Sequence, residues 1–446
     1  MSLEIKYLPQ QYRTVYNPVE IVMLETNSTT RGYVGFAYLI DVKDGGNLLG
    51  RLRVPPTQST GFGRFDMSGV MKSYMSSDLG LLNGISIESM FDNTNSYKDL
   101  SLQFGWIHYN GGTATISMNQ TVTFPDSTTA NSYNLLTFNG SLPNYRRDVV
   151  NFYDWQNTNY YLKYTNNILS RKFLTNSPPG TAVNNQYNQK VRITDEGYIY
   201  LLYDFSDTTS LLGFTVKEYR ENGNLISTTS FNTPALNTFN HIRIPCSPTT
   251  LNKINSSRVS SGSLPAVSSN ATSYTINLRT ETSTGSEIFH FNIDTECRYE
   301  TRRIEFLNSL GGFDYFNFTK VSKHSEEIER KFFQTTANDL TSTGSINYSI
   351  SNREKVQYYT KSSPKMKLTS DWIDSKTYNW LLELIESPEI YLLDSYALPG
   401  EDAINLRRIP IKNINGNWEE KLDSVDKLFN LEIDLEFGMD NFRQSF

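Results

Sequence analysis

The sequence has few of the residues that usually build metal and redox sites. It contains two cysteines, Cys246 and Cys297, and four histidines among 446 residues. Two cysteines are too few for a disulfide framework, and a zinc site needs several ligands clustered in sequence. We therefore expect both cysteines to be buried as small apolar side chains, with the distance between them left open. No metal and no cofactor are expected.

Long apolar runs and basic stripes are also missing. No run of about 18 apolar residues occurs, so no membrane span is predicted. The opening MSLEIKYLPQQYRTVYNP lacks the apolar core of a signal peptide, which predicts folding in the reducing cytosol where the chain is made. Lysine and arginine occur singly and the formal net charge is −6. Specific nucleic-acid binding is therefore not expected.

Catalytic motifs are absent from the sequence. There is no G-x-S-x-G, Walker loop, HExxH or G-x-G-x-x-G, and GFGRFD at 61–66 lacks the third glycine of a dinucleotide loop. The histidines are far apart in sequence: His108, His241, His290 and His324. Each is interpreted as a satisfied or exposed side chain. No catalytic residue is assigned, and the chain is not expected to be an enzyme.

Acidic pairs and aromatic residues keep a carbohydrate-related alternative open. A glycosidase needs two carboxyl groups across a sugar bond. Candidate pairs are Glu20 with Glu25 and Asp195 with Glu196, although such pairs occur in any chain with 47 acidic residues. Sugar binding without catalysis would need exposed aromatic rings, which the chain could supply.

Aromatic and turn-forming residues are what the sequence has in excess. It contains 28 Tyr and 25 Phe, with Ser, Thr and Asn throughout. Aromatic and β-branched residues suit half-buried strands, and Asn, Ser and Gly suit turns. The composition therefore predicts a mainly β protein.

Two stretches, 25–52 and 204–231, resemble each other. Each has a Thr-Thr loop, a Gly-Phe pair, a strand and a tight turn ending Gly-Asn-Leu-aliphatic. The turns contain Asp44-Gly45 and Asn222-Gly223, which are strong two-residue hairpin signals. A strand precedes each stretch, and a further hairpin follows. This order predicts a duplication and two tandem β-sandwich units of immunoglobulin type.

The last third of the chain has a different pattern. The segment 371–387 has apolar residues at helical spacing, with Asp371 or Asp374 as its N-cap and Pro388 ending it. The segment 428–437 alternates between apolar and mostly acidic residues, which predicts a strand with one buried face and one solvated face. The solvated face could repel DNA, meet a basic partner or simply face water.

The hairpin RRIEFLNSLGGFDYFNF at 302–318 has apolar residues on both faces of its second strand. Phe313 and Tyr315 share one face, while Phe316 and Phe318 point to the other. Two apolar faces indicate cover on both sides. That cover would come from a neighbouring domain, another subunit or the segment 128–184. We predict an interface at Phe313, Tyr315, Phe316 and Phe318 together with Trp380.

These patterns predict a mainly β fold with two tandem immunoglobulin-like β-sandwich units and a C-terminal α+β domain. The expected boundaries are a first unit at 1–127, a structured crossover at 128–184, a second unit at 185–320 and the α+β domain at 321–446.

Four segments carry a resemblance to a known family: YNPVEIVMLETNS, RLRVPP with GFGRFDMSGVMKSYM, RRIEFLNSLGGFDYFNF and SDWIDSKTYNWLLELIESPEIYLLD. Together they resemble virion structural proteins of tailed phages that infect Bacteroidota, including crAss-like phages. The resemblance implies a β-sandwich protein of the neck or tail, assembled as a homo-oligomeric ring between portal and tail.

The expected function is accordingly that of a non-enzymatic structural component of the virion. The expected partners are other copies of the chain and neighbouring neck and tail proteins, with no membrane, although DNA could pass through the ring. The alternatives are a carbohydrate-binding or glycan-cleaving tail fibre or adhesin, and a capsid decoration protein. Copy number, symmetry, position in the particle, neighbours and host stay open.

Overall fold

The computed structural model describes residues 3–9, 12–77, 79, 95–143, 174–178, 189–203, 211–232, 240–254, 266–280, 288–296, 298–336, 338–348, 350–351, 353–397, 404–414 and 428–442. The fold is mainly β, with 54% strand and 9% helix, as predicted. The chain divides into two compact units. Unit 1 comprises Met1–Thr295 and Leu307–Asp314, and unit 2 comprises Glu296–Phe306 and Tyr315–Phe446. Most of the predicted crossover, and Cys297, lie outside the described residues.

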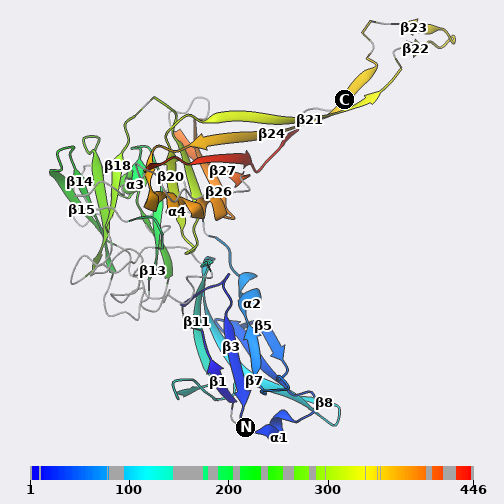
Figure 1. Cartoon of the computed structure of the whole chain (residues 1–446), viewed down its shortest axis with the longest axis vertical. Coiled ribbons are helices and arrows are strands. Elements are labelled where there is room, and N and C mark those ends of the chain that lie inside the picture. Colours follow the sequence, from blue (N-terminus) through cyan, green and yellow to red (C-terminus); the bar gives the residue numbers. More distant parts are fainter. Residues whose placement is uncertain are drawn as a thin grey trace. The chain divides into compact units, whose positions relative to one another are not determined.

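The first part of unit 1 is a sandwich of two sheets (Figure 1). One sheet has the order β10 (Thr129–Ala130), β9 (Val122–Thr123), β1 (Leu3–Tyr7), β3 (Glu20–Glu25) and β6 (Gly63–Asp66). The other has β2 (Tyr12–Thr14), β11 (Ser132–Phe138), β7 (Tyr97–Asn110), β4 (Ala37–Asp44) and β5 (Asn47–Val54), with β8 (Thr113–Ser117) also on β7. One core joins residues of both sheets, among them Ile21, Met23, Ile40 and Phe104. Since β11 belongs to it, this sandwich extends past residue 127.

Two short helices connect strands of the first sandwich: α1 (Ser28–Arg31) and α2 (Ser68–Lys72). The sequence predicts a helix over 65–75 with Asp66 or Ser68 as N-cap, but the N-cap position is Met67. Asp66 still helps to fix the helix start, because its Oδ1 accepts hydrogen bonds from the backbone N–H of Ser68 (3.0 Å) and Val19 (3.1 Å).

The second part of unit 1 has a five-stranded sheet facing a two-stranded one. The larger sheet has the order β12 (Gln189–Val191), β18 (Phe289–Ile293), β17 (Ser273–Thr280), β14 (Leu211–Tyr219) and β15 (Leu225–Asn232). The smaller one pairs β13 (Tyr198–Tyr203) with β16 (Asn240–Pro245), and α3 (Pro248–Lys253) follows it. The core contains Phe214 and Tyr274 from the first sheet, Ile199 and Ile242 from the second, and Cys246, which is buried as expected.

The pairing of the strands supports the predicted duplication. In one sandwich β4 lies between β5 and β7, and in the other β14 lies between β15 and β17, with antiparallel pairing throughout. The preceding strands, β3 and β13, lie in the second sheet of each sandwich. Both hairpin turns use a glycine with positive φ, +53° at Gly45 and +78° at Gly223. The immunoglobulin type of these units stays a prediction.

Unit 2 is built on one large antiparallel sheet. Its order is β20 (Phe313–Phe318), β19 (Arg302–Leu307), β26 (Ile390–Ala397), β27 (Ile404–Asn413), β29 (Glu432–Phe437), β24 (Lys355–Thr369) and β21 (Lys323–Gln334), with β30 (Asn441–Phe442) also on β24. Two short pairs complete the unit: β22 (Asn338–Leu340) with β23 (Ile346–Tyr348), and β25 (Ile373–Asp374) with β28 (Leu428–Phe429).

The predicted amphipathic helix is present as α4 (Ser375–Glu386). Asp374 is its N-cap and accepts a hydrogen bond from the backbone N–H of Thr377 (3.1 Å). Trp380, Leu381 and Leu384 are buried in the core that α4 shares with the sheet. The helix ends one residue before Ser387, so Pro388 follows its last turn as predicted. Among the described residues, none of the helices has the length and apolar character needed to cross a membrane.

The alternation predicted for 428–437 is confirmed, but the single strand is not, because β28 ends at Phe429 and pairs with β25, and β29 begins at Glu432 in the large sheet. Leu431, Ile433 and Leu435 are buried under α4, whereas the carboxylates face the other way. Those carboxylates meet lysines of the neighbouring strands, because Glu432 pairs with Lys367 and Glu436 with Lys412, each at 2.8 Å. For Glu432 and Glu436, the basic partner that the sequence left open is therefore a lysine of the same chain.

Candidate functional site

The five predicted interface residues belong to the interior of the single chain. Phe313, Tyr315, Phe318 and Trp380 are at most 6% exposed, and Phe316 is half-buried. The ring of Phe316 lies 5.0 Å from Phe318 and 6.1 Å from Trp380, measured between ring centres. The predicted division of faces is confirmed, and four of the five side chains are covered within the chain, while Phe316 keeps partial exposure.

The second face of this hairpin is polar and buried. Glu305 is fully buried and forms an ion pair with Arg408, whose Nη2 donates to Oε1 over 3.0 Å. The hydroxyl of Tyr315 donates to the same oxygen (2.8 Å). Arg303 lies 4.8 Å from the centre of the Tyr315 ring and donates to Asn317 (2.9 Å). Buried charges that are paired in this way fix the alignment of three strands.

The Gly-Gly turn of the hairpin is held by other segments of unit 1. The side-chain amide of Asn308 donates to the backbone oxygen of Leu174 (2.8 Å). The backbone N–H of Ser141 donates to the backbone oxygen of Ser309 (2.9 Å). A Cβ on Gly311 would lie 1.9 Å from the backbone oxygen of Asn139. Packing against segment 128–184, one of the covers the sequence left open, is therefore present at the turn.

The acidic pairs have structural partners. Glu20 pairs with Arg64, and Glu196 forms an ion pair with Lys253. Asp195 accepts a hydrogen bond from the backbone N–H of Arg192 (2.8 Å). These carboxylates stabilise turns and strand ends.

The histidines differ from one another. His108 packs with tilted rings against Trp106 and Tyr33, with ring centres 4.9 and 4.8 Å away, and His324 is exposed. The side chain of His241 lies outside the described residues. The Nδ1 atoms of His290, which is 4% exposed, and of the partly buried His108 make no hydrogen bond within the described part of the chain, so the interpretation as satisfied or exposed is wrong for both.

His290 lines a polar groove of about 250 Å³ at one end of the five-stranded sheet. The groove is lined by Tyr219, Arg220, Glu221, Ser273, His290 and Asn292, among others. Burial lowers the pKa of His290, so its imidazole is neutral at pH 7 and one ring nitrogen is an acceptor. Tyr219 presents its ring edge-on to His290, with ring centres 6.3 Å apart.

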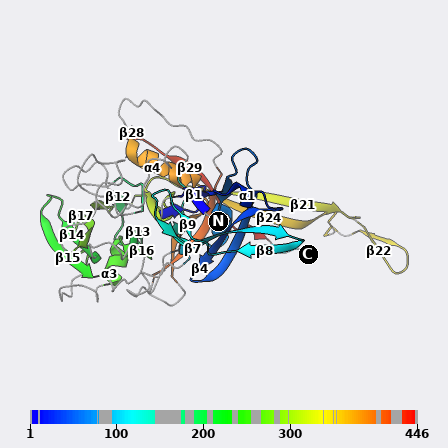
Figure 2. The same ribbon diagram turned by 90° about the horizontal axis from the view of Figure 1, so that it is seen from below.

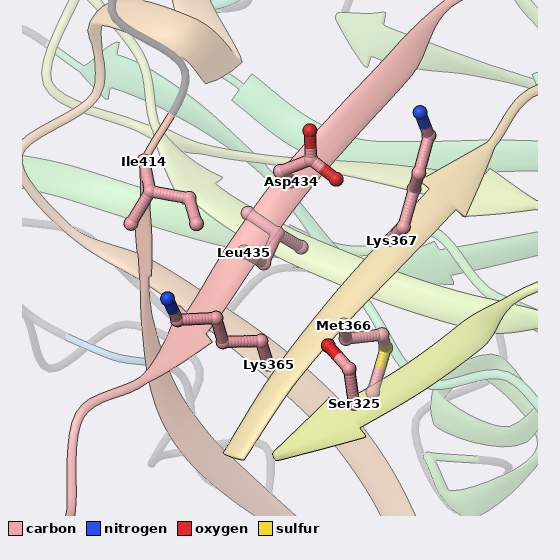
Figure 3. A pocket seen from close by; sticks show the side chains of 7 residues that line it. All are labelled: Ser325, Lys365, Met366, Lys367, Ile414, Asp434 and Leu435. Carbon is pink, nitrogen blue, oxygen red and sulfur yellow. The ribbon is translucent and has the colours of Figure 1, made fainter. Parts of the chain in front are cut away.

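A second groove, of about 170 Å³, lies on the sheet of unit 2 (Figure 3). There Lys367 of β24 lies opposite Asp434 of β29, and Lys365 lies on the other side of Leu435. Both lysines already form ion pairs, with Glu327 and Glu432, so their charge is compensated within the chain. The groove therefore has no excess positive charge on these residues with which to hold an anion.

The most distinctive surface of unit 2 is a two-stranded ribbon that runs out of the sheet. We call residues 326–364 the arm. Its strands pair from Glu326–Pro364 to Gln334–Lys355, and both views show them leaving the sheet (Figures 1 and 2). Along the arm, β24 has a second neighbour only where β30 pairs with Lys361 and Ser362, as far as the described residues go. All residues of β21 are exposed.

Large apolar side chains are exposed along the arm: Ile328, Phe332, Phe333, Leu340, Ile346, Ile350 and Tyr358. Leu340, Ile346 and Ile350 near its tip are 76%, 70% and 92% exposed. Phe333 and Tyr358 lie 6.0 Å apart between ring centres, so part of the apolar surface is contiguous. Exposed contiguous apolar surface is typical of an interaction site.

Sequence reasoning missed the arm. A signal was present, because KHSEEIERKFFQ combines charges with adjacent phenylalanines and lacks the alternation of a strand with one buried face. No protein-family model matches this chain, and no curated protein matches it either.

Proposed function

We propose that the chain is a non-enzymatic structural subunit of a tailed-phage particle, as its resemblance to virion proteins of phages of Bacteroidota implies. It is homo-oligomeric, forms a ring in the neck or tail between portal and tail, and contacts neighbouring neck and tail proteins. It becomes part of the virion after assembly in the host cytoplasm.

The observation that carries this proposal is the arm. An isolated two-stranded ribbon is marginally stable in water at best, and the arm also exposes its apolar side chains. Such a ribbon gains stability when a partner covers it. Each unit has a large buried core, which suits a structural building block that presents contact surfaces.

The test combines imaging with analysis of particles. Purified full-length protein should form a closed ring in negative-stain micrographs and a high-mass species by light scattering. Mass spectrometry of purified virions should detect the chain in tailed particles. A monomer at all concentrations, together with absence from virions, would overturn the proposal.

A second candidate, carbohydrate binding by a tail fibre or adhesin, is favoured by the polar groove. A neutral imidazole acceptor, the carboxylate of Glu221 and the amide of Asn292 line it beside the ring of Tyr219. These groups suit the hydroxyls and the apolar face of a sugar. Binding of neutral oligosaccharides on a glycan array, lost in Tyr219→Ala and retained in Tyr358→Ala on the arm, would favour this function. Absence of binding on the array would refute it.

A further inference from the structure

The arm has one free strand edge. β21 is the last strand of the large sheet, so among the described residues its outer N–H and C=O groups face no other strand. Natural proteins protect such edges with charges and bulges. β21 has six charged residues from Lys323 to Lys331, whereas the bulge of the arm lies on the other strand, where Tyr358 of β24 is the extra residue. A charged edge resists indiscriminate pairing but accepts a strand whose charges match.

We propose that two copies of this chain join arm to arm, with β21 pairing antiparallel to β21 about a two-fold axis at Ile328. The inference concerns the homo-oligomeric part of the proposed role and rests on it; a two-fold contact joins two copies and adds to the contacts that would close the ring. In this register Ile328 lies opposite Ile328 of the second copy. Glu326 lies opposite Arg330 of the second copy, and the two-fold axis makes this ion pair occur twice.

The other face of the paired strands brings Glu327 opposite Glu329 of the second copy. Both carboxylates already have a cation beside them, since Glu327 pairs with Lys365 and Glu329 with Lys331 (3.3 Å). A two-fold axis perpendicular to the sheet keeps each side chain on the same face of the sheet. In every symmetric register one residue therefore lies opposite its own copy. The neighbouring symmetric registers place Glu327 or Glu329 directly against itself. The register at Ile328 instead has an apolar centre with an ion pair on each side.

The paired edge also carries apolar side chains. At roughly 200 Å² for a fully exposed large side chain, Ile328, Phe332 and Phe333 of β21 present about 300 Å². β21 spans roughly 40 Å at about 3.3 Å per residue, and in this register Phe333 lies opposite Lys323 of the second copy. The main-chain hydrogen bonds between the two edges and the two ion pairs supply the rest of the contact.

Charge exchange tests the register in the full-length protein. In Glu326→Arg, the introduced guanidinium faces Arg330 of the second copy, and in Arg330→Glu two carboxylates face each other. Each variant alone should dimerise about tenfold more weakly than the wild type, or worse, in sedimentation velocity. An equimolar mixture should regain association. In the mixed dimer the two introduced side chains, of opposite charge, face each other, and the unchanged Arg330 of one chain faces the unchanged Glu326 of the other.

The matched control is Lys355→Glu, a charge reversal on the other strand of the arm. It should associate like the wild type, and all variants should keep the wild-type circular dichroism and melting temperature. Equal weakening by the control, failure of the mixture to recover, or a wild-type chain that stays monomeric would overturn arm pairing. If the variants associate as strongly as the wild type and are still found in virions, arm pairing is wrong and the structural role stands. If the chain is absent from virions, the structural role fails, and recovery in the mixture still decides the pairing.

Discussion

Replacing Gly311 by alanine should destabilise unit 1 by about 2–5 kcal/mol. Gly311 has a φ of +87°, in the left-handed region that costs an L-residue roughly 1–2 kcal/mol. The new Cβ would also lie 1.9 Å from the backbone oxygen and 2.8 Å from the backbone carbon of Asn139. The neighbour is backbone, so it cannot rotate away as a side chain would, and overpacking of this kind costs about 1–3 kcal/mol.

Gly223 provides the matched control within the same unit. Its φ is +78°, but a Cβ there would meet nothing within 4 Å. Gly223→Ala therefore measures the conformational cost alone, about 1–2 kcal/mol. The difference between the two variants isolates the contact of the turn with Asn139.

The assay is calorimetry of the full-length protein, with hydrogen exchange to locate the change. With a difference near 2 kcal/mol, Gly311→Ala should melt roughly 4–8 °C below Gly223→Ala. Exchange should increase at 307–314 in the first variant only. Equal melting temperatures for the two variants would refute the close packing of the turn.

Three further predictions concern stability. Glu305→Ala leaves the guanidinium of Arg408 buried without its carboxylate and should cost about 3–5 kcal/mol in urea unfolding. Asp374→Ala removes the hydrogen bond to the N–H of Thr377 and should cost about 1 kcal/mol in the same assay. Burial raises the pKa of Asp66, but hydrogen bonds from Ser68 and from the backbone of Val19 outweigh it and leave the pKa below 3.8. The stabilisation from Asp66 is therefore present above pH 3.8 and is lost as the pH falls through its lower folded pKa, so Asp66→Asn should flatten the acid limb of melting temperature against pH.

Each of these has a contrary outcome. Glu305→Ala unfolding at the wild-type urea concentration would show that the ion pair contributes nothing. A urea midpoint of Asp374→Ala equal to that of the wild type would deny the cap. An acid limb that is unchanged in Asp66→Asn would show that its carboxyl is not coupled to folding.

Local patterns could be predicted correctly from the sequence. Helix α4 is predictable because Asp374, the apolar spacing and Pro388 all act within one or two turns of chain. Strand β29 is predictable because a period of two directly reports one buried face. The hairpin turns at Gly45 and Gly223 are predictable because positive φ restricts the residue type.

The candidate site was less accessible to sequence reasoning. The pattern of 302–318 indicates buried aromatics, but it does not say what buries them, and the predicted interface there is an internal core. Phe332 and Phe333 of the arm look like core residues in sequence, although both are about half exposed. His290 looks ordinary in sequence because its isolation from hydrogen-bond partners depends on strands that are distant along the chain.

The sequence by itself determined the mainly β class, the repeated hairpin order and the helix with its caps, because neighbours along the chain set backbone conformation and periodicity. The tertiary structure alone decided which apolar residues are covered, since burial depends on segments that are far away in sequence. It placed Phe318 and Trp380 together in a core and left Phe332 and Ile350 on an uncovered arm. Large apolar side chains thus fill the core in one part of the chain and form an exposed surface in another.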